Sequence, residues 1–424
     1  MTTASRSHDT LDISSHAFWS LPPGEREPAF AELRRDRPLS WHRPAETELL
    51  PDEDDPGFWA LVTHADIVAV SRDAQTWGSG IQYGGVMLEN VPEDMLEAAH
   101  SILSMDAPRH AKQRKVIASV FTPRRVRTIE EQIRAQARGI VDDLVASGTG
   151  EVDFVDRVAS RLPMWTISEM IGIEEPDRER IARAANAMVS WNDPEFIGDG
   201  DPMGVLLESL MTLHQAAFGL ADARRSRPAD DLMTALVQAE VEGVQLTDED
   251  IASFFVLLCV AGNDTTRQTT SHAALALDRH PDQKALLLED FAGRIGTGVE
   301  EFVRWASPVL TFRRTARHDT EIRGQRIAEG EKVVMFYLSG NRDGDVFAAP
   351  DTFDVTRDPN PHIGFGGGGP HFCLGSHLAR MQLRSMSDEL LHRLPDLSVG
   401  EPEYLAGNFI NGIKRLPVIL GEAR

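Results

Sequence analysis

The sequence is poor in cysteine, with only Cys259 and Cys373 among its 424 residues. Two thiols cannot build a disulfide framework, a four-cysteine iron–sulfur site or a zinc knuckle. Basic residues are also scarce, at 43 against 66 acidic ones, so the net charge is -23. Because an acidic surface repels phosphate backbones and anionic lipids, we expect neither nucleic acid nor an anionic membrane as a partner.

Long apolar runs are missing as well. The first thirty residues carry charges throughout and lack the apolar core of a secretory signal. The most apolar stretch, IASFFVLLCVAG, is shorter than the roughly 20 residues that span a bilayer. We therefore expect a cytoplasmic protein without a membrane span. No repeat or Pro/Ser-rich linker divides the chain, so residues 13–424 are predicted to form one domain after a disordered start at residues 1–12.

Helical patterns dominate what is present. FWALVT alternates like a strand and a helix follows it, KVVMFYL reads as another strand, and most of the remainder is helical. The longest helical pattern, LTDEDIASFFVLLCVAGNDTTRQTTSHAALALDRHP, is apolar nearly all round and should run through the middle of the protein. The predicted fold is mainly α with a minor β region.

Cys373 lies in an unusual loop, FGGGGPHFCLG, with a helical pattern starting directly after it. Backbone N–H groups and the dipole at a helix N-terminus favour thiolate over thiol. Glycines let the backbone, and a large flat partner, approach closely. A thiolate held in such a loop suits an axial ligand of a soft metal. A buried structural cysteine beside a glycine turn is the alternative, and Cys259 is expected to be a core residue of the long helix.

The pattern F-G-x-G-x-H-x-C-x-G resembles the haem-binding loop of the cytochrome P450 superfamily. The resemblance implies that the Cys373 thiolate ligates the iron of haem b, within a loop framed by Phe365, Gly366 and Gly375. It also implies a single-domain P450 fold, with the haem between the long central helix and this loop.

A second pair of motifs agrees with the resemblance. EFVRW supplies an E-x-x-R motif, and a later F-x-x-P-x-x-F-x-x-x-R pattern follows it. In the family these residues form a buried structural network, here Glu301, Arg304 and Arg357. The alternative is an ordinary surface ion pair, because an acid and a base three positions apart on a helix, such as Glu301 and Arg304, are more often exposed to solvent.

AGNDTT lies inside the long apolar helix and resembles the family's distal oxygen-binding groove. The resemblance implies that Ala261 and Gly262 leave room for dioxygen. It also implies that Thr265 holds the oxygen group bound at the iron and that Asp264 relays protons, because O–O cleavage requires two protons while bulk water is kept out. The alternative is that the threonines bond to helix carbonyls and that Asp264 faces solvent.

Four cationic positions correspond to the family's ligands of the haem propionates. They are His110, Arg114, Arg314 and His371, whereas Arg313 fits this role less well. Cations are required there because two carboxylates must be neutralised at a half-buried edge. The alternative is an ordinary solvated face.

Four features of the sequence resemble actinobacterial methyl-branched lipid ω-hydroxylases and related steroid side-chain hydroxylases. They are the extra glycine of the cysteine loop and the segments VRWASPV, FFVLLCVAGN and NFINGIK. Asn411 departs from the histidine that this group often has. The resemblance implies hydroxylation by O2 at or near the end of a lipid chain. Hydroxylation of a terpenoid or macrolide, a peroxide-driven peroxygenase and a non-enzymatic haem sensor are the alternatives.

The resemblance also indicates where a hydrophobic substrate would bind. IQYGGVMLENVPEDM resembles the family's mobile entrance loop. The remaining contacts are expected at Val260, Ala261, Val309, Leu310, Phe312, Asn408, Phe409 and Ile410. They are mostly apolar, which favours a greasy ligand oriented by few polar groups. Ordinary core packing is the alternative for each of them.

Electrons must come from outside, because no flavin, nicotinamide or iron–sulfur motif is left over. A ferredoxin and its reductase are the expected donors to a monomeric enzyme. A local basic surface that includes Arg109, Lys112, Lys115, Arg380 and Arg384 could receive an acidic ferredoxin, or could simply be solvated.

Overall fold

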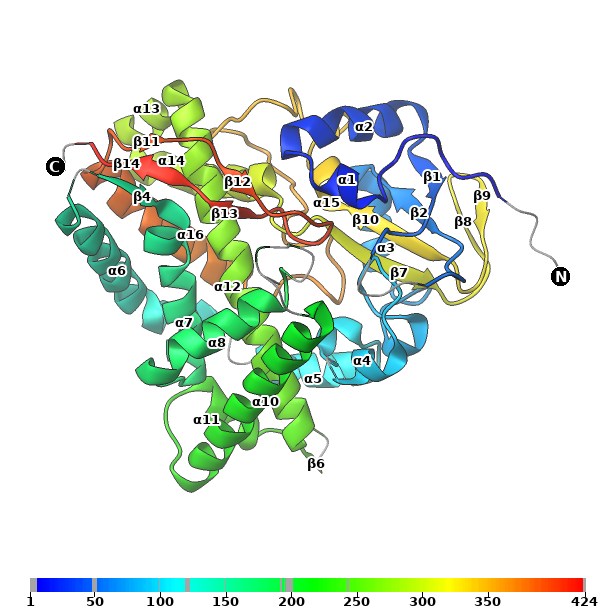
Figure 1. The fold of residues 1–424 in the computed structure, drawn as a ribbon, viewed down its shortest axis with the longest axis horizontal. Coiled ribbons are helices and arrows are strands. Elements are labelled where there is room, and N and C mark those ends of the chain that lie inside the picture. Colours follow the sequence, from blue (N-terminus) through cyan, green and yellow to red (C-terminus); the bar gives the residue numbers. More distant parts are fainter. Residues whose placement is uncertain are drawn as a thin grey trace.

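Helices fill one side of the molecule and a mixed sheet fills the other (Figure 1). The computed structural model describes residues 6–47, 52–98, 100–118, 123–148, 150–190, 193, 195, 201–241 and 244–421. Its larger helices are α2 (Pro23–Asp36), α3 (His64–Arg72), α5 (Arg109–Ala118), α6 (Pro123–Ala146), α7 (Arg161–Ile171), α8 (Glu175–Ala187), α10 (Pro202–Ser226), α12 (Asp248–Arg279), α13 (Pro281–Glu289), α14 (Phe291–Ala306) and α16 (Ser376–Arg393). Shorter ones are α1 (His16–Trp19), α4 (Glu93–Ala98), α11 (Leu232–Val237) and α15 (Tyr337–Gly340), with single turns at Ile81–Tyr83, Ile102–Ser104 and Val155–Ala159.

The main sheet has the strand order β1-β2-β10-β7-β3. Its strands are β1 (Leu39–His42), β2 (Phe58–Leu61), β3 (Trp77–Gly78), β7 (Thr311–Ala316) and β10 (Lys332–Phe336). The small sheets are built from β4 (Glu151–Asp153), β5 (Glu240–Val241), β6 (Val244–Gln245), β8 (Thr320–Ile322), β9 (Gln325–Ile327), β11 (Ser398–Val399), β12 (Glu403–Tyr404), β13 (Ile413–Arg415) and β14 (Pro417–Ile419). The predicted class, mainly α with a minor β region, is confirmed.

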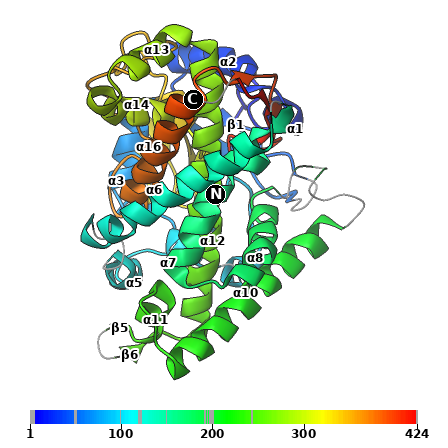
Figure 2. The ribbon, with the colours of Figure 1, turned by 90° about the vertical axis from the view of Figure 1, so that its left-hand side faces the viewer.

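Helix α12 runs through the helical half as predicted (Figure 2). It begins with a capping box, in which Thr247 and Asp250 each accept from the other's backbone N–H. The expected apolar surface is interrupted by one polar stretch. Residues 266–272 read TRQTTSH and are all buried, and apolar residues follow them again. These polar groups must therefore be satisfied inside the protein.

The chain start is more ordered than the sequence suggested. Residues 1–5 lie outside the described part, but Arg6 donates to Glu331 at 2.7 Å and its guanidinium lies 4.4 Å from the Trp59 ring centroid. The backbone N–H of Asp9 donates to the carbonyl of Trp41 at 2.7 Å. The expectation of disorder up to residue 12 is therefore not met from Arg6 onward. Within the described ranges, no helix is long and apolar enough to cross a bilayer.

Candidate functional site

Cys373 lies two residues before the N-terminal cap of α16, as the motif predicted. Its own N–H donates to the carbonyl of Phe365 at 3.0 Å, which closes the loop on itself. Burial raises the pKa of the Cys373 thiol, whereas the N–H groups of Gly375 and Ser376 and the nearby Arg114 and Arg380 act to lower it. Burial has the larger effect, so the pKa of this thiol is raised overall. The converging donors offset part of that effect and would stabilise the sulfur as a thiolate ligand of a metal.

The run of glycines lets the loop backbone pack closely against protein. A Cβ at Gly367 would lie 2.6 Å from Oγ of Ser71, at the end of α3. A Cβ at Gly369 would overlap the carbonyl oxygen of Ser71 and lie 3.0 Å from Cα of Arg72. Gly369 also has φ +77°, which strains any residue with a side chain. These glycines therefore seat the cysteine loop on α3.

The four predicted propionate ligands come together beside this loop. The rings of His110 and His371 have centroids 4.2 Å apart, and Arg114 donates to the carbonyl of Phe372. Burial, with Arg314 and other nearby cations, lowers the pKa of His371 to about 2, and burial with Arg114 lowers that of His110 to about 4.

This cluster fits a partner with two carboxylates. Nε2 of His110 is buried and has no hydrogen-bond partner among the described residues. Two neighbouring guanidinium groups are stabilised poorly in a protein unless anions neutralise them, and the two neutral histidine rings can each donate an N–H to the same anions. The residues present therefore suit the propionate edge of a haem.

The middle of α12 carries Ala261 and Thr265. Ala261 is exposed although it lies in the middle of a buried helix, and the hydroxyl of Thr265 donates to the carbonyl of Ala261 at 3.1 Å. A Cβ at Gly262 would lie 2.5 Å from Cδ1 of Ile167 on α7. Gly262 thus allows two helices to pack closely.

Asp264 faces the interior, which excludes the solvent-facing alternative. Its carboxyl is 2% exposed and pairs with Arg267, one turn further along α12. Asn186 on α8 accepts from Nη1 of Arg267 at 3.0 Å and from Nδ2 of Asn263 at 3.1 Å. The sequence reasoning missed this network; the i,i+3 spacing of Asp264 and Arg267 was its only local signal.

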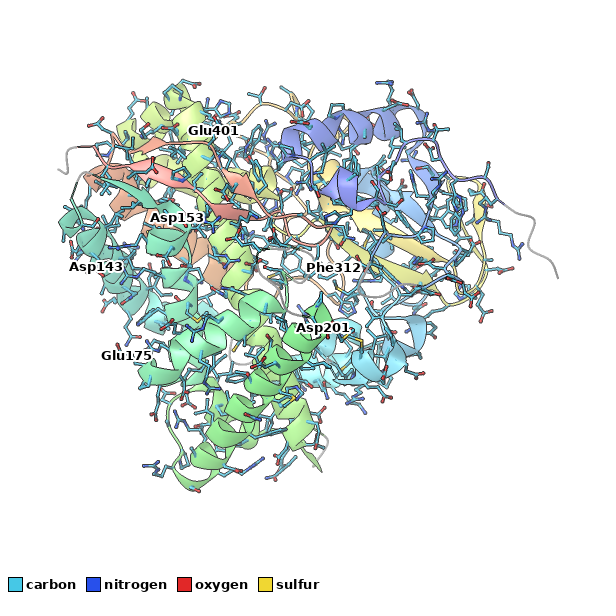
Figure 3. All side chains as sticks on the ribbon, viewed as in Figure 1. Asp143, Asp153, Glu175, Asp201, Phe312 and Glu401 are labelled. Carbon is cyan, nitrogen blue, oxygen red and sulfur yellow. The ribbon has the colours of Figure 1, made fainter. Side chains whose placement is uncertain are left out.

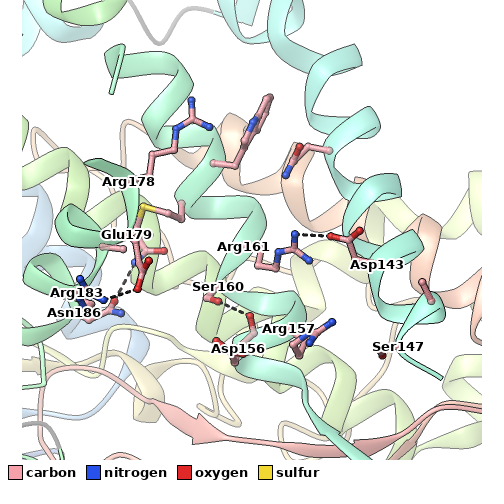
Figure 4. A pocket seen from close by; sticks show the side chains of 16 residues that line it. Asp143, Ser147, Asp156, Arg157, Ser160, Arg161, Arg178, Glu179, Arg183 and Asn186 are labelled. Atoms are coloured by element: carbon pink, nitrogen blue, oxygen red, sulfur yellow. Dashed lines mark hydrogen bonds and ion pairs between the residues drawn. The ribbon is translucent and has the colours of Figure 1, made fainter. Parts of the chain in front are cut away.

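Behind this network lies a surface groove of about 920 Å³ between α6, α7 and α8 (Figure 4). Asn186 and Asn263 line its wall. Oδ1 of Asn263, Oδ2 of Asp264 and Nε of Arg267 are buried without a partner in the described part of the chain. Buried water commonly satisfies such atoms.

Glu301 forms the centre of the predicted structural network. Its carboxylate accepts from Nε and Nη2 of Arg304, both at 2.7 Å, and from Nε of Arg357 at 3.2 Å. Asn360 and the backbone N–H of Asp354 also donate to it, at 3.1 and 2.8 Å. Glu301 is 0% and Arg304 1% exposed, so the solvated alternative is excluded.

The predicted substrate contacts separate into two groups. Val260, Val309, Phe409 and Ile410 belong to one apolar cluster, and Phe312 meets Phe409 edge-on at 5.7 Å between ring centroids. Phe312 lies near the middle of the molecule, between strands and helices (Figure 3).

Two other predicted contacts are not members of this cluster. Leu310 is 0% exposed in another cluster with Phe58 and Phe336. Asn408 donates to Glu89.

Two of the cations proposed to receive an electron donor already have acidic partners. Arg380 donates to both oxygens of Glu300, at 2.6 and 2.8 Å, and its guanidinium lies 4.4 Å from the ring centroid of Phe365. Arg109 pairs with Asp250 at 3.2 Å. Arg380 thus supports the cysteine loop instead of projecting freely from the surface.

Comparisons with known proteins agree with this geometry. The family model for cytochrome P450 matches residues 91–395. A methyl-branched lipid omega-hydroxylase of Mycobacterium tuberculosis is 40% identical over 416 residues, covering 96% of this chain and 94% of the relative. A steroid C26-monooxygenase of Mycolicibacterium smegmatis is 38% identical, covering 92% and 89%.

Two solved structures have the same fold. Mycobacterium marinum cytochrome P450 CYP268A2 in complex with pseudoionone superposes with a TM-score of 0.95 at 57% identity, covering 98% of this chain and 99% of that one. CYP108D1 from Novosphingobium aromaticivorans superposes with a TM-score of 0.83 at 31% identity, covering 94% and 95%.

Proposed function

The chain belongs to the cytochrome P450 family and is a monooxygenase with a haem-thiolate iron cofactor, and we propose that it hydroxylates the end of a methyl-branched lipid or sterol side chain. The reaction also uses O2 and electrons from a redox partner. The bound haem, which we propose to be haem b, supplies the oxygen-inserting chemistry. The chain's own residues hold it, orient the lipid and move protons.

The apolar wall of Val260, Val309, Phe312, Phe409 and Ile410 carries the proposal. Terminal C–H bonds are stronger than internal ones, so attack at a chain end requires a site that presents only that end. A narrow wall of bulky apolar groups next to Ala261 can do so, because burying the rest of the lipid supplies the binding energy. Relatives named for ω- and side-chain hydroxylation support the same assignment.

Cys373 is proposed as the thiolate ligand, and His110, Arg114, Arg314 and His371 as the groups that hold the propionates. The support is the convergence of backbone donors on the Cys373 sulfur and the unpartnered Nε2 of His110 among the described residues. Phe365 closes the cysteine loop through the N–H of Cys373.

Asp264 and Thr265 are proposed to move protons between solvent and the oxygen site. Thr265 adjoins the exposed Ala261, whereas Asp264 meets Arg267 and lies behind the groove wall. Thr265→Ala should retain lipid binding but divert electrons from NAD(P)H into hydrogen peroxide, because protons are no longer delivered at the correct oxygen. Equal product per NAD(P)H in Thr265→Ala and in the wild type would remove Thr265 from this role.

The proposed electron donor is a ferredoxin with its reductase. The test is turnover with a ferredoxin–reductase pair, compared with peroxide alone. Product that depends on the ferredoxin is the expected result. Equal turnover with peroxide alone would contradict it.

Product mapping tests the substrate class. Phytanic acid and cholest-4-en-3-one should shift the haem iron from low to high spin and give terminal alcohols by mass spectrometry. Mainly in-chain alcohols, or no shift with either compound, would refute terminal hydroxylation of such lipids.

A terpenoid hydroxylase is the second candidate. It is favoured by the 57% identical Mycobacterium marinum protein, whose structure is a complex with pseudoionone, a methyl-branched isoprenoid ketone. Tight binding of pseudoionone without binding of the two lipids would select this alternative.

A further inference from the structure

The loop that the sequence presents as a mobile entrance, residues 81–95, is fastened to one face of the main sheet. In the register of β7 and β10, Arg313 pairs with Val334 and Thr315 pairs with Lys332. Because side chains alternate along strands, Arg313, Thr315 and Lys332 all point to the same face. Arg314, between the first two, points to the opposite face, where His371 lies close enough to be affected by its charge.

Arg313 makes several contacts with this loop. Its guanidinium donates to the carbonyl of Tyr83 at 3.0 Å and to Oδ1 of Asn90 at 2.7 Å. Its backbone N–H donates to the carbonyl of Val86 at 2.8 Å. The hydroxyl of Thr315 adds a second donor to Tyr83, at 2.7 Å. The buried side chain of Arg313 and the hydroxyl of Thr315 therefore hold both ends of residues 83–90.

The loop sequence is adapted to this arginine. A Cβ at Gly84 would overlap Nη2 of Arg313 and lie 2.9 Å from its Cζ. Gly84 also has φ +80°, a conformation that L side chains rarely adopt. Lys332 on the same face pairs with Asp55, and its Nζ also donates to the carbonyl of Leu88 at 3.4 Å.

A second bond joins residues 83–90 to the apolar wall. Nδ2 of Asn408 donates to Oε1 of Glu89 at 2.7 Å, and these residues are 5% and 2% exposed. The carbonyl of Asn408 accepts from the hydroxyl of Thr311 at 2.8 Å. Phe409, the next residue, contributes its ring to the wall beside Phe312. The position of the loop is thus tied to the position of Phe409.

We propose that Arg313 is a positioning residue for the substrate, which clamps residues 83–90 against the main sheet, and that the Glu89–Asn408 bond joins this clamped loop to Phe409. Arg313 and Phe312 are adjacent in β7 and point to opposite faces of the sheet. The clamp therefore selects among hydrophobic molecules through the position of Phe409, whose ring meets Phe312. The role in selection depends on the hydrophobic substrate proposed above, whereas the clamp itself does not.

The clamp is tested without substrate, by hydrogen exchange of residues 81–95 in the haem-loaded protein. Arg313→Met keeps the stem of the side chain and removes its donors. We expect exchange about tenfold faster in this peptide than in the wild type, because local opening becomes easier. Arg326→Met is the matched control, since Arg326 pairs with Asp319 at the surface. Unchanged exchange in Arg313→Met would overturn the clamp.

Selection is tested with phytanic acid and pseudoionone as probes. In Arg313→Met, we expect Kd from the spin-state shift to rise about tenfold for phytanic acid, while imidazole binding to the haem iron stays unchanged. Equal phytanic acid Kd values in the variant and the wild type would overturn a role in selection. If neither probe shifts the wild-type spectrum, the proposed substrate class fails, and hydrogen exchange still decides the clamp.

A double-mutant cycle tests the link to Phe409 and replaces the first variant if Arg313→Met does not fold. Glu89→Gln, Asn408→Ala and the double variant are compared with the wild type by the Kd for phytanic acid. We expect a coupling of about threefold or more, since the two side chains contact directly. Additive effects would show that the Glu89–Asn408 bond does not position the wall.

Discussion

Removing the charge of Glu301 should destabilise the protein far more than removing an exposed carboxylate. Glu301→Gln keeps the size of the side chain but replaces one acceptor oxygen by a donor. Two arginines that are 1% and 9% exposed, Arg304 and Arg357, then lose their only charged partner within the described network. An amide donor also faces donors that previously bonded to the carboxylate.

The size of the effect follows from burial. Breaking a buried ion pair by removing one partner costs about 3–5 kcal/mol, and the sharing of one carboxylate by two arginines indicates the upper end of that range. With an unfolding entropy of about 2.1 cal/mol/K per residue, a chain of 424 residues changes its Tm by about 1 °C per kcal/mol. We therefore expect Tm to fall by about 5 °C.

The measurement is thermal unfolding followed by far-UV circular dichroism, at one scan rate, with and without haem. Glu179→Gln is the control, because Glu179 and Arg183 form an i,i+4 pair whose side chains are 81% and 70% exposed. Such a pair contributes about 0.3–0.5 kcal/mol, so Tm should change by less than about 1 °C. If Glu301→Gln lowers Tm no more than Glu179→Gln does, the network does not contribute to stability as argued.

Two further variants test the cysteine loop. Cys373→Ser should abolish the red-shifted Soret band of the reduced carbon monoxide complex, whereas Cys259→Ser should retain it, because Cys259 is a core residue 1% exposed; the reverse result would exchange their roles. Gly369→Ala should reduce haem retention and Tm because its Cβ would overlap Ser71, while Gly344→Ala, with open space around its Cβ, should do neither; equal haem content in the two variants would show that seating on α3 is unimportant.

Local motifs explain most of what the sequence predicted correctly. The cysteine loop and the E-x-x-R pair depend on spacings of a few residues, so their geometry is set by one loop and one helix. The capped start of α12 and its central place likewise follow from a local pattern. Arg357 also joins Glu301 as the family pattern implied, because the segment after Phe347 folds back over α14.

What the sequence could not provide are contacts between distant segments. The cysteine-loop glycines meet Ser71 and Arg72, which lie almost 300 positions earlier in the chain. Asp264 is held through Arg267 by Asn186 on another helix. No local pattern distinguishes these contacts from their alternatives. A run of glycines is equally typical of a flexible loop and of a closely packed one, and an acid within a helix can face either solvent or the interior.

The buried polar stretch of α12, residues 266–272, holds the C-terminal segment in register. Hydroxyls of Thr269 and Thr270 donate to carbonyls one turn earlier, at 2.9 Å each, so they need no outside partner. Two other side chains of the stretch reach the C-terminal segment: Gln268 accepts from the N–H of Ile413 at 2.8 Å, and His272 bonds the carbonyl of Asn411 at 3.0 Å. An apolar helix surface would allow this segment to slide, whereas directional bonds fix its register. The helix that carries Thr265 therefore also holds the segment that follows Phe409, and the two residues proposed for oxygen chemistry and for substrate contact keep a fixed relation.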